Sequence, residues 1–223
     1  MLKRALFAET LGSLLLTGVV IGSGILGSGL SPHNGAVALI GNTAATAAIL
    51  YVLITIFGPI SGAHFNPAVT LIFALNKEIR WPAACAYGAA QVIGCIGGAM
   101  LAHAMFEAPL LQVSAQDRSG LAKTLAEAVA TFALVLTILG TRSAKPGATP
   151  AAVALVITAG YWWTSSTSFA NPAITIARAL TDSFAGIRPV DAPGFIASQL
   201  AGALAALTTS KFLFPYKRHG EAT

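Results

Sequence analysis

The chain has 223 residues, of which 55% are hydrophobic and only 9% are charged, and its formal net charge is +5. Soluble globular domains carry roughly 25% charged residues, so this chain has too little polar surface to cover a particle in water. Its basic residues are scattered between long apolar runs and are not gathered on one face, which argues against nucleic acid as the partner. The composition predicts a protein surrounded by membrane lipid.

Apolar runs of the length that crosses a bilayer, about 20 residues, follow one another along the chain. The N-terminal run comes after Lys3 and Arg4, as in a signal peptide, but no small-residue cleavage site with a soluble domain follows it, so we interpret it as the first span. Gly and Pro residues between the runs mark the connections. The predicted spans are residues 6–26, 36–57, 82–106, 121–140, 151–166 and 193–214.

The distribution of basic residues predicts how these spans are oriented. A cytoplasmic N-terminus gives the cytoplasmic side nine of the thirteen Lys and Arg residues. The positive-inside rule then predicts a multi-pass protein of the plasma (cell inner) membrane with both termini in the cytoplasm. The nine residues are Lys3, Arg4, Lys77, Arg80, Arg142, Lys145, Lys211, Lys217 and Arg218.

Two short apolar segments, residues 66–75 and 171–180, do not fit the pattern of full spans. As helices they would be roughly 15 Å long, about half the thickness of the hydrocarbon layer. Both begin with Asn-Pro-Ala, and aligning them reveals two repeats, about 1–110 and 118–216, within a single domain of residues 1–223. Each repeat holds three spans, so the second enters the membrane from the opposite side, a pattern typical of transport sites.

The Asn-Pro-Ala elements, Asn66-Pro67-Ala68 and Asn171-Pro172-Ala173, each predict the start of a helix. Asn is a preferred N-cap residue, and Pro at the first helical position costs no hydrogen bond. Two half-helices that enter from opposite faces would meet start to start near the midplane, where their positive partial charges add. The amide groups of the two Asn residues would donate to a passing oxygen, while the field disfavours cations.

Residues 61–70, Ser-Gly-Ala-His-Phe-Asn-Pro-Ala-Val-Thr, resemble the first signature loop of the aquaporin, or major intrinsic protein, family. The resemblance covers nearly the whole chain, including Glu9, Glu127, Gln91 and Gln199. It implies an all-α membrane fold of six tilted helices and two re-entrant half-helices around one pore per subunit, usually in a homotetramer. We expect no enzymatic activity and no cofactor, because the sequence has no Gly-rich phosphate loop, nucleophile elbow or clustered triad. We expect no metal, because the His residues lack ligand spacing.

The second motif departs from the pattern of water-selective members, in which Arg follows Asn-Pro-Ala. Here that residue is Ile174, and the other filter positions of the family fall by spacing on Thr46, Ala159 and Ser168, with Gly160 as the alternative in the fifth span. None of these residues is large or charged. The sequence therefore predicts a wide, partly apolar constriction.

Such a constriction would admit neutral solutes such as glycerol, urea and the trihydroxides of arsenic and antimony. The chain in this respect resembles the bacterial aquaglyceroporins associated with arsenic resistance. A strictly water-selective channel and an ion-conducting pore remain the alternatives.

Arg178 has two interpretations. It lies four residues after Ile174, so its side chain either reaches back over the pore mouth or pairs with Asp182 at the next i+4 position. We favour the pairing. Phe169 stands where the family usually has a small residue, and the sequence assigns it no role.

Three further polar residues have alternative roles. Glu9 and Glu127 are carboxylates in apolar spans, which is the pattern of a proton relay. The family resemblance favours a supporting role instead, in which each accepts hydrogen bonds from the loop that leads to a half-helix. His64 is expected to line the cytoplasmic vestibule, where it either gates the pore by titration or, as we favour, remains neutral and bonds the loop.

Overall fold

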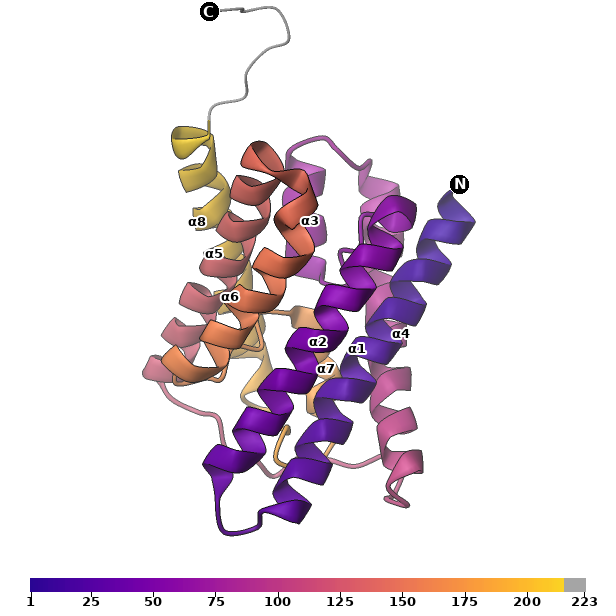
Figure 1. Ribbon diagram of the computed structural model, residues 1–223, viewed down its shortest axis with the longest axis vertical. Coiled ribbons are helices and arrows are strands. Elements are labelled where there is room, and N and C mark those ends of the chain that lie inside the picture. Colours follow the sequence, from indigo (N-terminus) through magenta and orange to yellow (C-terminus); the bar gives the residue numbers. More distant parts are fainter. Residues whose placement is uncertain (215–223) are drawn as a thin grey trace, which may run out of the picture.

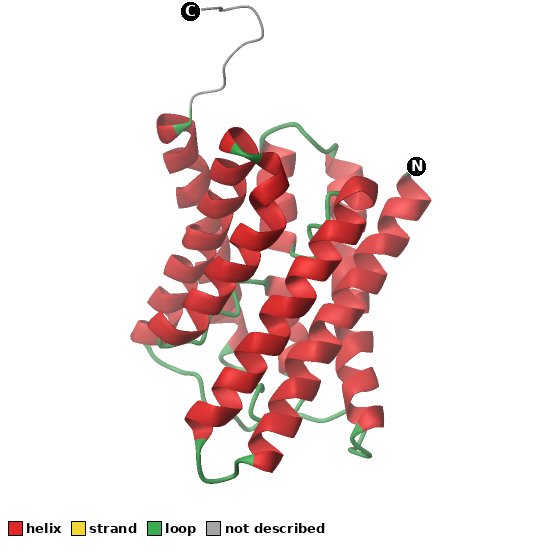
Figure 2. Ribbon diagram, viewed as in Figure 1, coloured by secondary structure: helices red, strands yellow, loops and turns green. Residues whose placement is uncertain are grey.

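Residues 1–214 are described by a computed structural model of the chain, and their regular structure is helical throughout (Figure 2). Six longer helices form a bundle, and two short helices lie inside it (Figure 1). The longer helices are α1 (Leu2–Leu30), α2 (Gly35–Ser61), α4 (Trp81–Met105), α5 (Leu121–Ala144), α6 (Thr149–Trp163) and α8 (Ala192–Leu213). The short ones are α3 (Pro67–Leu75) and α7 (Pro172–Arg178), and a 3-10 turn, η1 (Pro146–Ala148), leads into α6.

The predicted spans all correspond to helices, and the all-α fold with two half-helices is confirmed. α1, α2, α4 and α5 are long and apolar enough to cross a membrane. α6 has only 15 residues, because the backbone becomes extended at Thr164 and starts the loop to the second motif earlier than we predicted. Lys217 and Arg218, and the last two residues of the second predicted repeat, lie outside the described residues.

The two ends of the bundle are distinguished by the chain termini. The start of α1 and the end of α8 lie at one end, which we call the N-terminal end (Figure 1). The connections from α1 to α2 and from α4 to α5 lie at the other, which we call the opposite end. α3 lies in the N-terminal half of the bundle and α7 in the opposite half. The two short helices thus extend away from each other, as the inverted repeat predicts.

Small residues let two long helices within each repeat approach closely. A Cβ atom added to Gly98 of α4 would lie 2.3 Å from the Leu14 carbonyl oxygen of α1. One added to Gly202 of α8 would lie 2.0 Å from the Ala128 carbonyl oxygen of α5. Helices that pack in lipid rely on such close backbone contact, since lipid gives them no hydrophobic driving force. The α1–α4 and α5–α8 pairs are therefore the rigid frames of the two halves.

We expect Gly98→Ala to weaken the α1–α4 pair, because the added methyl group meets backbone that cannot move aside. Overpacking of this kind costs about 1–3 kcal/mol, so the melting temperature of the purified protein in detergent should fall. Gly88→Ala in the same helix is the matched control, since a Cβ atom there meets nothing within 4 Å. Equal melting temperatures for the two variants would contradict the close contact.

Candidate functional site

The two Asn-Pro-Ala elements meet in the middle of the bundle. The Asn66 side-chain oxygen accepts from the Ala68 N–H at 2.9 Å, and that of Asn171 accepts from the Ala173 N–H at 3.0 Å, so both are N-caps with Pro at the first helical position. α3 and α7 start where the sequence predicted.

The two halves are joined by the amide nitrogens of these N-caps. Asn66 Nδ2 donates to the Ala170 carbonyl at 2.7 Å, and Asn171 Nδ2 donates to the Phe65 carbonyl at 2.7 Å. Each amide has two N–H groups, and within residues 1–214 only one of the two is used. The second N–H of each amide is left to donate to a solute in the adjoining cavity, to which both Asn residues contribute.

The loops before the motifs adopt backbone conformations that non-glycine residues rarely adopt. φ is +50° at Ala63 and +48° at Phe65 in the first loop, and +52° at Ser168 and +48° at Ala170 in the second. Such left-handed residues persist only where the surrounding structure fixes them. In each loop, two successive N–H groups donate to one acceptor side chain.

Glu9 and Glu127 are those acceptors, and both are completely buried. Glu9 accepts from the His64 N–H at 3.0 Å and the Phe65 N–H at 2.7 Å. Glu127 accepts from the N–H groups of the two residues before Asn171, each at 2.8 Å. Neither carboxylate lines the cavity. This geometry fits the supporting role that we favoured over a proton relay.

The glutamine residues of the repeat complete the same arrangement twice. Gln91 Nε2 donates to Glu9 at 2.8 Å and to Thr70 at 2.9 Å. Gln199 Nε2 donates to Glu127 at 2.6 Å and to Thr175 at 2.9 Å. Each Thr lies on the first turn of a half-helix, so each network connects two long helices to one half-helix.

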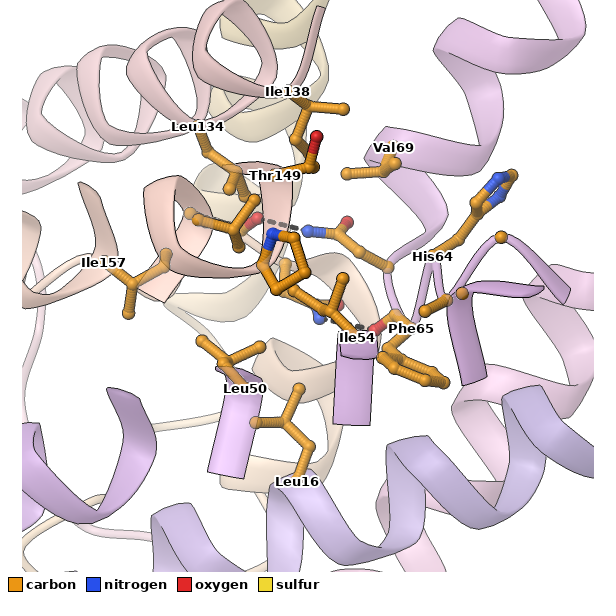
Figure 3. Close-up of a pocket in the computed structure, with 18 of the residues that line it drawn as sticks. Leu16, Leu50, Ile54, His64, Phe65, Val69, Leu134, Ile138, Thr149 and Ile157 are labelled. Atoms are coloured by element: carbon orange, nitrogen blue, oxygen red, sulfur yellow. Dashed lines mark hydrogen bonds between the residues drawn. The ribbon is translucent and has the colours of Figure 1, made fainter. Parts of the chain in front are cut away.

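A cavity of about 520 Å³ lies between the two halves. It extends from the connection between α5 and α6 at the N-terminal end, past both Asn residues, to the end of α7. Figure 3 shows aliphatic side chains around much of it. The Val, Leu and Ile residues that line it are Leu16, Val20, Leu50, Ile54, Val69, Leu134, Ile138, Val153, Ile157 and Ile174.

Three of the four predicted filter residues, Thr46, Ser168 and Ile174, line this cavity. The assignment of Ala159 is wrong, because its side chain is exposed on the outer surface of α6. The alternative, Gly160, is buried, and a Cβ atom there would lie 2.5 Å from Ser168 Oγ. Spacing from the motif does not determine the rotation of α6, because an irregular loop separates the two.

Tyr161 is a pore residue that the sequence did not reveal. It is buried, it lines the cavity, and its hydroxyl lies 3.3 Å from Thr46 Oγ1. Val153, Ile157 and Tyr161 recur at intervals of four on α6 and all line the cavity. This periodicity is the signal that could have identified the pore face. Tyr161 therefore adds a large side chain beside Thr46, which the assignment of four small or aliphatic filter residues did not include.

Arg178 lines the cavity, so the favoured pairing with Asp182 is wrong. α7 ends at Arg178, so Asp182 is not one helical turn further on, and its carboxylate instead accepts from the Ala115 N–H at 2.9 Å. The Arg178 side chain is buried and lies over the Phe169 ring, with 3.3 Å from the guanidinium carbon to the ring centroid. The alternative interpretation, in which Arg178 lies at the pore, is the one that agrees with this position.

His64 lines the part of the cavity toward the N-terminal end. Its Nδ1 lies 3.1 Å from Thr70 Oγ1, and its ring packs on Phe73 with 4.4 Å between centroids. These contacts are those of a side chain that supports its loop. The guanidinium carbon of Arg142 lies 4.5 Å from the centroid of the Phe73 ring, and Arg142 pairs with Glu78 at 2.8 Å.

We expect Glu127→Gln to destabilise the second loop and to lower solute flux. A Gln side chain has one acceptor oxygen, so one backbone N–H of the loop loses its partner, and a buried unpaired donor costs about 1–3 kcal/mol. Melting temperature in detergent and water flux into proteoliposomes should therefore fall together. The control is Glu107→Gln, which changes an exposed carboxylate. If Glu127→Gln kept both properties and abolished only a proton flux, the carboxylate would be a relay.

Known proteins share this pattern of sequence. The sequence model of the major intrinsic protein family matches residues 1–168. Aquaglyceroporin AqpS of Rhizobium meliloti (strain 1021) is 51% identical over 212 residues, which cover 95% of this chain and 91% of AqpS. Human aquaporin-2 is 35% identical over 70% of this chain and 57% of its own length, and the rice probable aquaporin PIP2-8 is 32% identical over 65% and 54%. The chain belongs to the major intrinsic protein family.

Proposed function

We propose that the chain is a passive membrane channel for water and small uncharged solutes such as glycerol. The observation that carries the proposal is a cavity that contains the starts of both half-helices and whose other lining side chains are mostly apolar. The similarity to an aquaglyceroporin across nearly the full length of both chains supports the same class of solute.

The lining of the cavity suits a solute that has hydroxyl groups on one side and carbon on the other. Polar side chains are the minority of the lining, and they include Thr46, Asn66, Tyr161, Ser168, Asn171 and Arg178. Small-molecule sites typically combine a mostly apolar wall with a few polar groups that orient the ligand. An ion would exchange its hydration shell for this wall with little compensation. The cavity therefore favours neutral solutes.

Ile174 extends the proposal to solutes larger than water. It lies at the first turn of α7, lines the cavity and has no charge. An aliphatic side chain at this point leaves room and apolar contact for the carbon atoms of a polyol. Trihydroxides of arsenic and antimony have the size and neutrality of such solutes, and we include them in the proposal.

We also propose that the protein lies in the plasma membrane as a homotetramer with both termini in the cytoplasm. The N-terminal end of the bundle carries Lys3, Arg4, Lys77, Arg80, Arg142, Lys145 and Lys211. The positive-inside rule assigns such an end to the cytoplasm. The tetramer rests on the family resemblance alone, and the mass of the protein–detergent particle in light scattering tests it.

Stopped-flow light scattering with proteoliposomes tests the choice of solutes. We expect the wild-type protein to pass water, glycerol and arsenous acid. Ile174→Arg should lower glycerol flux by at least about tenfold, equivalent to roughly 1.4 kcal/mol in the barrier, and water flux by less. Ile174→Leu keeps the volume and is the matched control.

Two results would contradict the proposal. Wild-type liposomes that pass water but neither glycerol nor arsenous acid would indicate a strictly water-selective channel. Equal losses of all three fluxes in Ile174→Arg would show that residue 174 does not select between solutes.

A further inference from the structure

The two ends of the cavity contain equivalent pairs of side chains. In each repeat, the residue seven positions after the motif Asn packs against the residue two positions before it. In the first repeat the pair is Phe73 and His64, with ring centroids 4.4 Å apart. In the second it is Arg178 and Phe169, and all four residues line the cavity. The two repeats thus form equivalent contacts. Of the two pairs, only the one toward the opposite end contains a guanidinium.

The guanidinium of Arg178 is buried without a counter-charge. Its residue is only 2% exposed, and within residues 1–214 no carboxylate forms an ion pair with it. Its side chain donates there to a single acceptor, the Ala185 carbonyl. Arg has five N–H donors, so most of them are left to face the cavity. A buried charge without partners is costly, which indicates that this one has a role in the cavity.

Arg118 is a second buried Arg, and its hydrogen bonds provide a comparison, because they all go to the protein and give it a purely structural role. Its Nε donates to the Gly186 carbonyl at 2.7 Å, and its two other nitrogens donate to the carbonyls of Ser166 and Phe184 at 3.2 and 3.3 Å. Arg118 does not line the cavity. Its guanidinium carbon lies 4.9 Å from the centroid of the Phe169 ring.

Phe169 is fixed from several sides. Its N–H donates to Glu127 at 2.8 Å, and its ring meets Phe195 edge-on with 5.2 Å between centroids. A guanidinium over an aromatic face is attracted by the negative charge of the ring, most strongly where water is absent. The ring therefore holds Arg178 in one position at the cavity wall.

We infer that Arg178 is the residue that selects solutes at the opposite end of the pore. Its charge repels cations, and its cavity-facing N–H groups donate to the oxygen atoms of small neutral solutes. Phe169 is the positioning residue. The inference rests on the proposed channel function and explains how the pore excludes cations although Ile174 follows the second motif.

Currents in planar bilayers and glycerol flux in proteoliposomes, measured on the full-length protein, test the assignment. The wild type should pass glycerol and carry no potassium current. Arg178→Met keeps a side chain of similar length without its charge, and we expect potassium current at least about tenfold above the wild-type background, equivalent to roughly 1.4 kcal/mol in the barrier. Arg178→Lys keeps the charge and should remain silent. The control is Arg188→Met, because Arg188 pairs with Asp117 at 2.9 Å outside the cavity and its loss should open no current.

The Phe169 variants decide the question even if Arg178→Met does not fold. Phe169→Leu removes the ring that holds the guanidinium and should raise the potassium current, whereas Phe169→Tyr keeps the ring and should not. Equal currents in these two variants, or a folded Arg178→Met that passes glycerol and stays electrically silent, would overturn the role of Arg178. A wild type that passes no glycerol would instead contradict the proposed channel function.

Discussion

Backbone that leaves the helix in the middle of a bilayer must find its hydrogen-bond partners inside the protein. In this chain Glu9 and Glu127 provide them, since each accepts from two consecutive N–H groups of a loop. Those bonds hold left-handed residues in place and so determine where each half-helix begins. Asn66 and Asn171 can then bond across to the opposite loop. The position of the pore therefore depends on two carboxylates that do not line it.

The hydrogen bonds within the two loops also determine which groups the cavity offers a solute. Because the loop N–H groups are satisfied by carboxylates, they do not face the cavity. What remains there is one N–H from each motif Asn, hydroxyl groups such as those of Thr46 and Tyr161, the His64 ring, and the guanidinium groups of Arg142 and Arg178. Most other contacts are with aliphatic or aromatic carbon. A neutral molecule with a few oxygens loses little on entering such a space, whereas a cation meets both an apolar wall and a like charge.

The sequence predicts those features that depend on local chemistry and on the repeat. The spans, the half-helix starts at Asn66 and Asn171, and the equivalence of Glu9 with Glu127 follow from composition, capping and alignment. The pore-facing residues of α6 do not, because the rotation of a helix depends on packing and not on spacing through an irregular loop. Tyr161 was missed for that reason. Arg178 was paired wrongly because a four-residue spacing is a contact only while the helix continues, and α7 ends there.

The inverted repeat gives the pore two equivalent ends, yet their charges differ. Both ends have an Arg over an aromatic ring, Arg142 over Phe73 and Arg178 over Phe169. Arg142 is partly exposed and pairs with Glu78, so water and a carboxylate screen its charge. Arg178 is buried and forms no ion pair within residues 1–214. A solute that crosses a passive pore passes both ends whichever way it moves, so one unpaired charge is enough to exclude cations in both directions. The first repeat therefore needs no charge at the position equivalent to Arg178, and this chain has Phe73 there.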